Sequence, residues 1–159
     1  MGGNGAHSYF KAKTLSNYTG VRFEQVDVID NVKVIQVANR SNTAIPVEAF
    51  TSEMYYVVNP KTGLIEHITF YDKKTGDIKH SIDLEFNPDG SFKPYREFTR
   101  KGKLRSEGSH LHRKWPKDKN GNKGRVSHDK NNIEPVNRYY MRYVNKAIRY
   151  NAKIRNNGK

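Results

Sequence analysis

Residues 109–115 contain the side chains with the clearest chemical potential, a His-x-His pair followed by two cations. His110 and His112 stand two positions apart, so on a strand both imidazoles lie on the same face. This spacing suits the acid and the base of a metal-independent ribonuclease, in which one imidazole removes the 2′ proton and the other protonates the leaving oxygen. Arg113 or Lys114 would then hold the phosphate. In the alternative interpretation, these four residues simply belong to a basic surface.

The His-x-His spacing also suits a pair of metal ligands. The neighbouring residues supply no carboxylate cluster to complete such a site, so we expect no metal ion and no cofactor there. The chain has no cysteine, which excludes disulfides, thiolate zinc sites, iron–sulfur clusters and cysteine nucleophiles. His67 falls on the polar face of a predicted hairpin and would form a site with Ser81 or Asp83, although nothing in the sequence requires it.

Positive charge is concentrated in the C-terminal half of the chain. The 159 residues include 29 Lys and Arg against 16 Asp and Glu, a formal net charge of +13. Residues 1–85 hold 9 basic and 10 acidic side chains, whereas the last 74 residues hold 20 and 6. This asymmetry predicts a polyanionic partner, usually nucleic acid, because Lys and Arg contacts release condensed counterions. A solvated, disordered basic tail is the alternative, and an anionic membrane is a weaker one.

Residues 131–159 have the pattern of a basic helix, with Pro135 suited to its first position. An apolar stripe at helical spacing is formed by Val136, Tyr140, Tyr143, Ala147 and Ile154. A second stripe is made of cations at steps of four, four, three and four residues: Arg138, Arg142, Lys146, Arg149 and Lys153. No acidic residue lies between Val136 and Lys159 to offset their repulsion, so we expect phosphate contacts that give affinity and register without sequence specificity. The cations expected to contact DNA outside the helix are Arg113, Lys114, Arg100, Lys101, Lys103 and Arg105.

The elements that must position these residues are mostly strands. Residues 32–37, 54–58, 64–71 and 77–86 read as strands, and the loops 59–63 and 72–76 have the same length and each end in glycine. Two such loops predict an antiparallel meander. If Tyr71 pairs with Asp77, the meander has one apolar face and one polar, solvated face.

The chain divides into three parts. Residues 1–20 are predicted to be an N-terminal arm that docks through its aromatic rings, and residues 21–130 a core domain with a long basic loop region at 91–130. Residues 131–159 are the basic C-terminal helix. We therefore expect an α+β fold, with a small antiparallel β-meander sheet packed with helices. No segment approaches the roughly 18 apolar residues of a membrane span, and we expect no membrane partner.

Four segments carry a family resemblance: residues 54–58, 63–72, 82–84 and 110–113. Together they resemble a domain of the minor head proteins of tailed phages of Gram-positive bacteria. The same domain occurs in polymorphic toxins of the type 24 group, which are predicted nucleases. The resemblance covers residues 32–115, and the whole chain is most similar to the staphylococcal phage proteins.

The phage resemblance implies a minor capsid (ejection) protein, packaged inside the head of the virion and delivered with the genome into the host cytoplasm. Its partner would be the double-stranded DNA of the phage genome, with portal or capsid proteins and a homo-oligomer as further options. We therefore predict non-enzymatic DNA binding without sequence specificity, with the genome ends as candidate sites for protection or circularisation. The toxin resemblance leaves the alternative of a metal-independent RNase that uses His110, His112 and Arg113.

Overall fold

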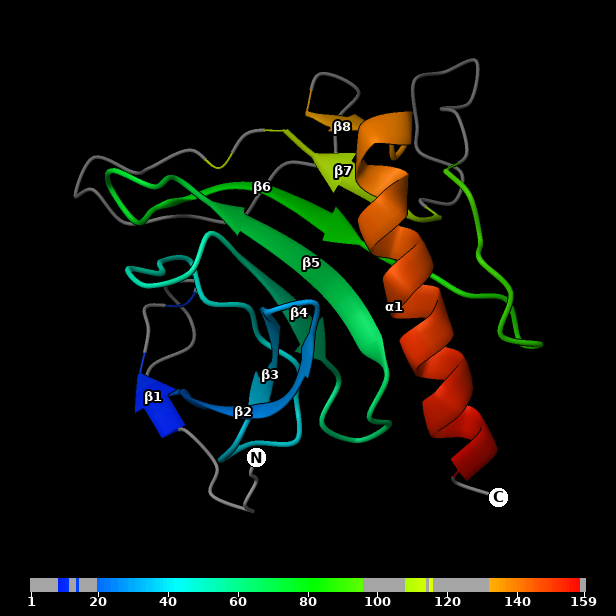
Figure 1. Ribbon diagram of the computed structural model, residues 1–159, viewed down its shortest axis with the longest axis horizontal. Helices are drawn as coiled ribbons and strands as arrows, with labels where there is room; N and C mark the ends of the chain where they lie inside the picture. Colours follow the sequence, from blue (N-terminus) through cyan, green and yellow to red (C-terminus); the bar gives the residue numbers. More distant parts are fainter. Residues whose placement is uncertain are drawn as a thin grey trace.

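The computed structural model describes residues 9–11, 14, 20–95, 108–113, 115 and 132–157. They form one eight-stranded sheet and one helix, α1 (Arg138–Asn157) (Figure 1). The strands are β1 (Tyr9–Lys11), β2 (Arg22–Ile29), β3 (Val32–Val37), β4 (Met54–Val58), β5 (Ile65–Tyr71), β6 (Ile78–Asp83), β7 (His110–His112) and β8 (Ile133–Glu134). Their order in the sheet is their order in the chain. This architecture confirms the α+β class.

The sheet is larger than predicted and is not a pure meander. β3 and β4 run parallel, and every other neighbouring pair is antiparallel. The parallel pair needs a crossover, which residues 38–53 provide without a helix. The predicted strands at 32–37 and 54–58 match β3 and β4, whereas β2 and β8 lacked a clear sequence signal. The predicted arm contributes the edge strand β1.

The sheet curls so that one face is concave. Phe10 of β1 stacks on Tyr55 of β4, with ring centroids 5.9 Å apart, although β2 and β3 separate these strands in the sheet. Val47 and Ala49 of the β3–β4 crossover close over this face. The core on the concave side is therefore built by strands folding over themselves, and docking of the N-terminal segment through Phe10 is confirmed.

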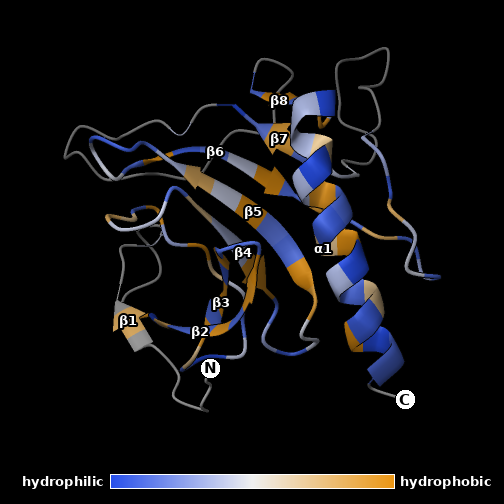
Figure 2. Ribbon diagram, in the orientation of Figure 1, coloured by the Kyte–Doolittle hydropathy of each residue, from blue (hydrophilic) through white to orange (hydrophobic). Residues whose placement is uncertain are grey.

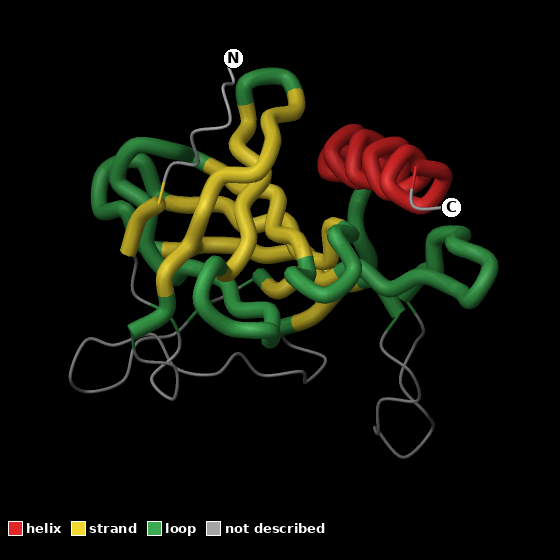
Figure 3. Tube along the Cα trace, turned by 90° about the horizontal axis from the view of Figure 1, so that it is seen from below, coloured by secondary structure: helices red, strands yellow, loops and turns green. Residues whose placement is uncertain are grey.

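The helix α1 covers the opposite, convex face. Val144 and Ala147 are fully buried against Ile68 of β5, Ile82 of β6 and Leu111 of β7. Figure 3, turned by 90°, shows α1 outside the sheet, and Figure 2 shows hydrophilic and hydrophobic residues alternating along the helix. Among the described residues no helix is both long enough and apolar enough to cross a bilayer.

The prediction of one dry and one wet face was wrong, because both faces of the central strands are buried. Thr69 and Ser81, expected in solvent, are 0% exposed. The predicted register was also wrong, by one residue at Tyr71, which pairs with Ile78, and by two from Phe70 onward, which pairs with His80 beyond a bulge. A bulge adds one residue to one strand and reverses the inward and outward alternation beyond it.

Two local predictions were closer to the structure. Gly63 and Gly76 adopt φ values of +75° and +78° at the ends of their loops, as the matching loop compositions indicated. The helix begins at Arg138 instead of at Pro135, because the Asn137 side chain accepts a hydrogen bond from the backbone N–H of Tyr140 at 3.2 Å and caps the first turn. Most of the predicted basic loop region, including residues 96–107 and 116–131, lies outside the described residues.

Candidate functional site

A row of three chemically active residues crosses three neighbouring strands. His67 of β5 pairs with Asp83 of β6, and Asp83 pairs with His110 of β7. His112 lies two residues further along β7 on the same face. We call these four residues the His–Asp cluster. They point to the concave side of the sheet, opposite α1.

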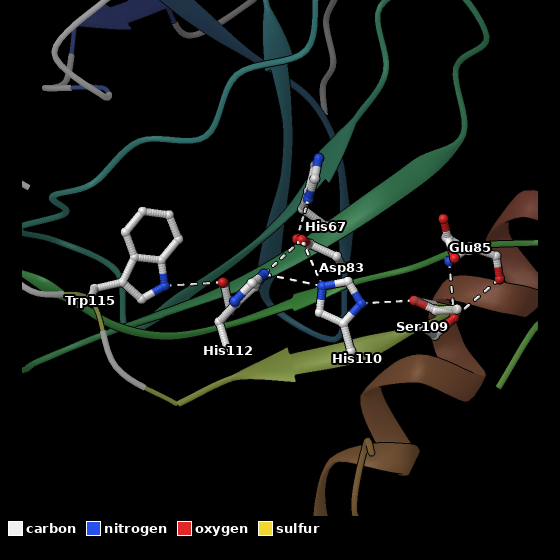
Figure 4. Close-up of polar contacts among 9 residues, drawn as sticks. His67, Asp83, Glu85, Ser109, His110, His112 and Trp115 are labelled. Atoms are coloured by element: carbon white, nitrogen blue, oxygen red, sulfur yellow. Dashed lines mark hydrogen bonds and ion pairs between the residues drawn. The ribbon is translucent and has the colours of Figure 1, made fainter. Parts of the chain in front are cut away.

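Asp83 is the centre of the His–Asp cluster (Figure 4). Its Oδ1 lies 2.8 Å from Nδ1 of His67. Its Oδ2 lies 3.0 Å from Nε2 of His112 and 3.3 Å from Nε2 of His110. The two Nε2 atoms are themselves only 3.1 Å apart. One carboxylate oxygen from β6 and two ring nitrogens from β7 therefore lie within 3.3 Å of one another.

Neighbouring groups fix the orientation of the β7 rings. Nδ1 of His110 lies 2.8 Å from the carbonyl oxygen of Gly108, which only accepts, so this nitrogen carries the proton. Ser109 accepts a hydrogen bond from the backbone N–H of Glu85 and donates one to its carbonyl oxygen. Trp115 donates its indole N–H to Ser81 Oγ at 3.0 Å. The cluster is thus held by both neighbouring strands and by the chain that follows β7.

The members of the cluster differ in how far their side chains are exposed. The side chains of His110 and His112 are 2% and 1% exposed, whereas those of His67 and Asp83 are 26% and 25% exposed. Burial alone would lower the pKa of His67, but the charge and the hydrogen bond of Asp83 outweigh it and raise that pKa. Burial alone would raise the pKa of Asp83, but the charge of His67 and the three histidine hydrogen bonds hold it well below its usual range. The carboxyl group is therefore ionised at neutral pH.

An open groove reaches the cluster from the surface. It is lined by His67, Asp83 and His110 and also by the cations Lys93 and Arg155. Arg155 comes from the last turn of α1, where its guanidinium also lies over the ring of Phe86. A small anion could enter this groove and meet both cations.

The structure changes the chemistry predicted for the His-x-His pair. The two imidazoles do lie on one face of a strand, as predicted. The argument against a metal ion was incomplete, because Asp83, 27 residues earlier in the chain, supplies the missing carboxylate. Arg113 is half-exposed, and its Nε lies 3.7 Å from Glu134 instead of at the cluster. Both Nε2 atoms face Asp83 in the interior, so the geometry does not favour a metal-independent RNase that uses His110, His112 and Arg113.

The second candidate site is the cationic stripe of α1: Arg138, Arg142, Lys146, Arg149 and Lys153. At 3.6 residues per turn these five positions fall within an arc of about 80°. The three buried residues of the helix, Val144, Ala147 and Asn151, fall on the opposite side. Four of the cations are exposed, and the fifth, Lys146, lies 2.5 Å from Asp30 in the β2–β3 turn. As predicted, no acidic residue of the helix offsets this charge, but a carboxylate from the sheet does so at Lys146.

Aromatic residues extend the stripe towards the start of α1. The guanidinium of Arg142 lies 4.7 Å and 4.6 Å from the ring centroids of Tyr139 and Tyr143. A groove beside them is lined by Tyr139 and by Lys73 and Lys79 of the β5–β6 hairpin. These two lysines were not among the predicted DNA contacts, since they belong to the half of the chain without excess positive charge.

The other predicted DNA contacts cannot be placed, because Lys114, Arg100, Lys101, Lys103 and Arg105 lie outside the described residues. The cationic stripe and the His–Asp cluster lie on opposite faces of the sheet. The chain matches no protein-family model, no curated protein and no solved structure. Its function is therefore argued from geometry and charge.

Proposed function

We propose that the protein binds double-stranded DNA without sequence specificity through the cationic stripe of α1. The observation that carries this proposal is the position of the exposed cations Arg138, Arg142, Arg149 and Lys153 opposite the buried side of the helix. Cations on this side meet a polyanion without disturbing the core.

The dimensions of the stripe suit a phosphate backbone. From Arg138 to Lys153 the helix rises about 22 Å at 1.5 Å per residue. Each phosphate that is neutralised releases condensed counterions and makes the slope of log K against log salt more negative by about 0.9. The stripe contains Arg and Lys but no pattern of base-reading side chains, so its contacts would fix register and affinity but not sequence.

Because α1 is already docked on the sheet, DNA binding through it would cost little conformational entropy. The helix is anchored by Val144, Ala147 and Asn151 before any ligand arrives. Its cations are therefore already aligned, and binding orders side chains but not the helix itself. The resemblance to phage minor head proteins suggests the phage genome as the DNA, inside the virion and then in the host cytoplasm, with the genome ends as preferred sites.

The test is a titration of labelled linear duplex DNA with the full chain at several salt concentrations. We expect a negative slope of about 3.6 from the four exposed cations. Replacing both Arg138 and Arg149 by Ala should reduce that slope by about 1.8. Arg155→Ala is the matched control, because Arg155 belongs to the same helix but points to the Gly90 carbonyl and Phe86.

A slope near zero, or equal losses for the double variant and for Arg155→Ala, would contradict the proposal. Competition between linear and nicked-circular DNA of the same length tests the preference for ends. A denaturing gel of the same samples, with RNA as a second substrate, tests the RNase alternative. Intact strands with a salt-sensitive complex are the expected result.

A further inference from the structure

We propose that Asp83, His110 and His112 bind one divalent transition-metal ion, of the Zn²⁺ class, on the concave face of the sheet. The ligand atoms would be Oδ2 of Asp83 and Nε2 of each histidine. This site is independent of DNA binding by α1, which lies on the other face.

The spacing of the three atoms suits metal coordination. They are 3.0, 3.1 and 3.3 Å apart. With bonds of about 2.1 Å, neighbouring ligand atoms are about 3.0 Å apart in an octahedron and about 3.4 Å apart in a tetrahedron. The observed spacings lie between these two values. One ion can therefore reach all three atoms without a change in the backbone.

The orientation of His110 directs one ring nitrogen at the other two atoms. Its Nδ1 lies 2.8 Å from the Gly108 carbonyl oxygen. Its Nε2 is therefore the nitrogen that faces Asp83 Oδ2 at 3.3 Å and His112 Nε2 at 3.1 Å. In the absence of a metal ion, hydrogen bonds among these three atoms are the competing explanation for their closeness.

The hydrogen bonds around the three proposed ligand atoms are those commonly made by metal ligands in proteins. Histidine ligands in proteins commonly donate their second ring N–H to a backbone carbonyl, as His110 does to Gly108. Ligating carboxylates are in turn hydrogen-bonded, as Asp83 is through Oδ1 by His67 at 2.8 Å. These contacts orient the donor atoms before an ion arrives.

The donor set indicates the class of metal. Two imidazoles and one carboxylate suit Zn²⁺, Co²⁺ or Fe²⁺ better than Mg²⁺ or Ca²⁺, which prefer oxygen ligands. Three protein ligands leave at least one coordination position for water or an anion. The groove that is lined by Asp83 and His110 is also lined by Lys93 and Arg155, so an anionic ligand would meet two cations in the same groove.

The experiment titrates the untagged full chain with Zn²⁺ alone by calorimetry and, in parallel, by fluorescence. Trp115 is the only tryptophan, and its ring centroid lies 6.5 Å from that of His112, so its emission reports on this site. All variants are made in a His7→Gln, His128→Gln background, which removes two histidines that are not part of the proposed site. We expect one Zn²⁺ per chain, a change in Trp115 emission and a higher melting temperature.

Four single variants separate the roles. Asp83→Asn and His110→Gln should each weaken Zn²⁺ binding more than 100-fold, and His67→Gln, outside the ligand set, by about 10–100-fold. His80→Gln is the control, since His80 lies on β6 but contacts the Arg113 carbonyl oxygen and Tyr140 on the convex face. It should bind as the background protein does.

Two results would overturn the proposal: no Zn²⁺ binding by the background protein, or unchanged binding in both Asp83→Asn and His110→Gln. The first result would mean that hydrogen bonds alone hold the three atoms together. If a ligand variant fails to fold, Co²⁺ binding to the background protein tests the proposal instead. Its visible absorption spectrum should show nitrogen and oxygen ligands in a low-symmetry site, and the spectrum of hexaaquacobalt would contradict the assignment.

Discussion

Asn151 of α1 forms two hydrogen bonds with the backbone of Ile65 in β5. Its Oδ1 accepts from the Ile65 N–H at 2.7 Å, and its Nδ2 donates to the Ile65 carbonyl oxygen at 3.0 Å. The register of the β4–β5 pairing shifts between Val57 and Val58, and Val58 is the residue that pairs with Ile65. The Asn151 amide bonds the Ile65 backbone at this irregular point and ties the cationic helix to the sheet.

Removal of this amide should destabilise the protein strongly. Asn151→Ala leaves the buried N–H and carbonyl group of Ile65 without these bonds, and the free energy of unfolding should fall by about 2–4 kcal/mol. Urea denaturation followed by circular dichroism measures the loss. Asn145→Ala is the matched control, since Asn145 is exposed on the same helix, and it should change stability by less than about 0.5 kcal/mol. Equal losses for the two variants would show that the pair with Ile65 contributes nothing specific.

The ion pair between Asp30 and Lys146 should restrain DNA binding. Asp30→Asn removes the carboxylate that Lys146 contacts, and asparagine tolerates the φ of 48° found at this turn position. Lys146 then becomes available to phosphate, so DNA should bind more tightly and the salt slope should steepen by about 0.9. Anisotropy titrations at several salt concentrations measure both. Asp89→Asn, in the exposed 87–91 turn, is the control and should leave the slope unchanged.

Local signals were sufficient for much of the fold. The strands at 32–37 and 54–58 and the two glycine-ended loops depend on residues close together in the chain, and the sequence shows them directly. The assignment of a solvated face failed because a second layer of residues covers it, and a bulge between Phe70 and Tyr71 moved Ile78 to that face. Such a bulge depends on the packing of two layers, which alternation within one strand does not reveal.

The candidate site divides in the same way. The His-x-His pair and the cationic stripe follow from spacing along one element, and both could be predicted. The link between Asp83 and His110 could not, because it depends on the pairing of β6 with β7 across residues 84–109. His67 and Asp83 were recognised as possible partners because they lie on neighbouring strands of one hairpin. Sequence reasoning therefore named all four residues as two separate pairs and missed that the Asp83 carboxylate joins them.

The two-residue turn between β2 and β3 gives a further test. Asp30 and Asn31 have φ values of 48° and 68°, so both central residues of this type I′ turn lie in the left-handed region. Asn31→Ala should lower the free energy of unfolding by about 1 kcal/mol, because alanine enters this region at a steric cost. Asn31→Gly avoids that cost and should be at least as stable as the wild type. Thermal or urea denaturation compares the two variants, and equal stability of the Ala and Gly proteins would mean that the backbone changes its turn conformation instead of bearing strain.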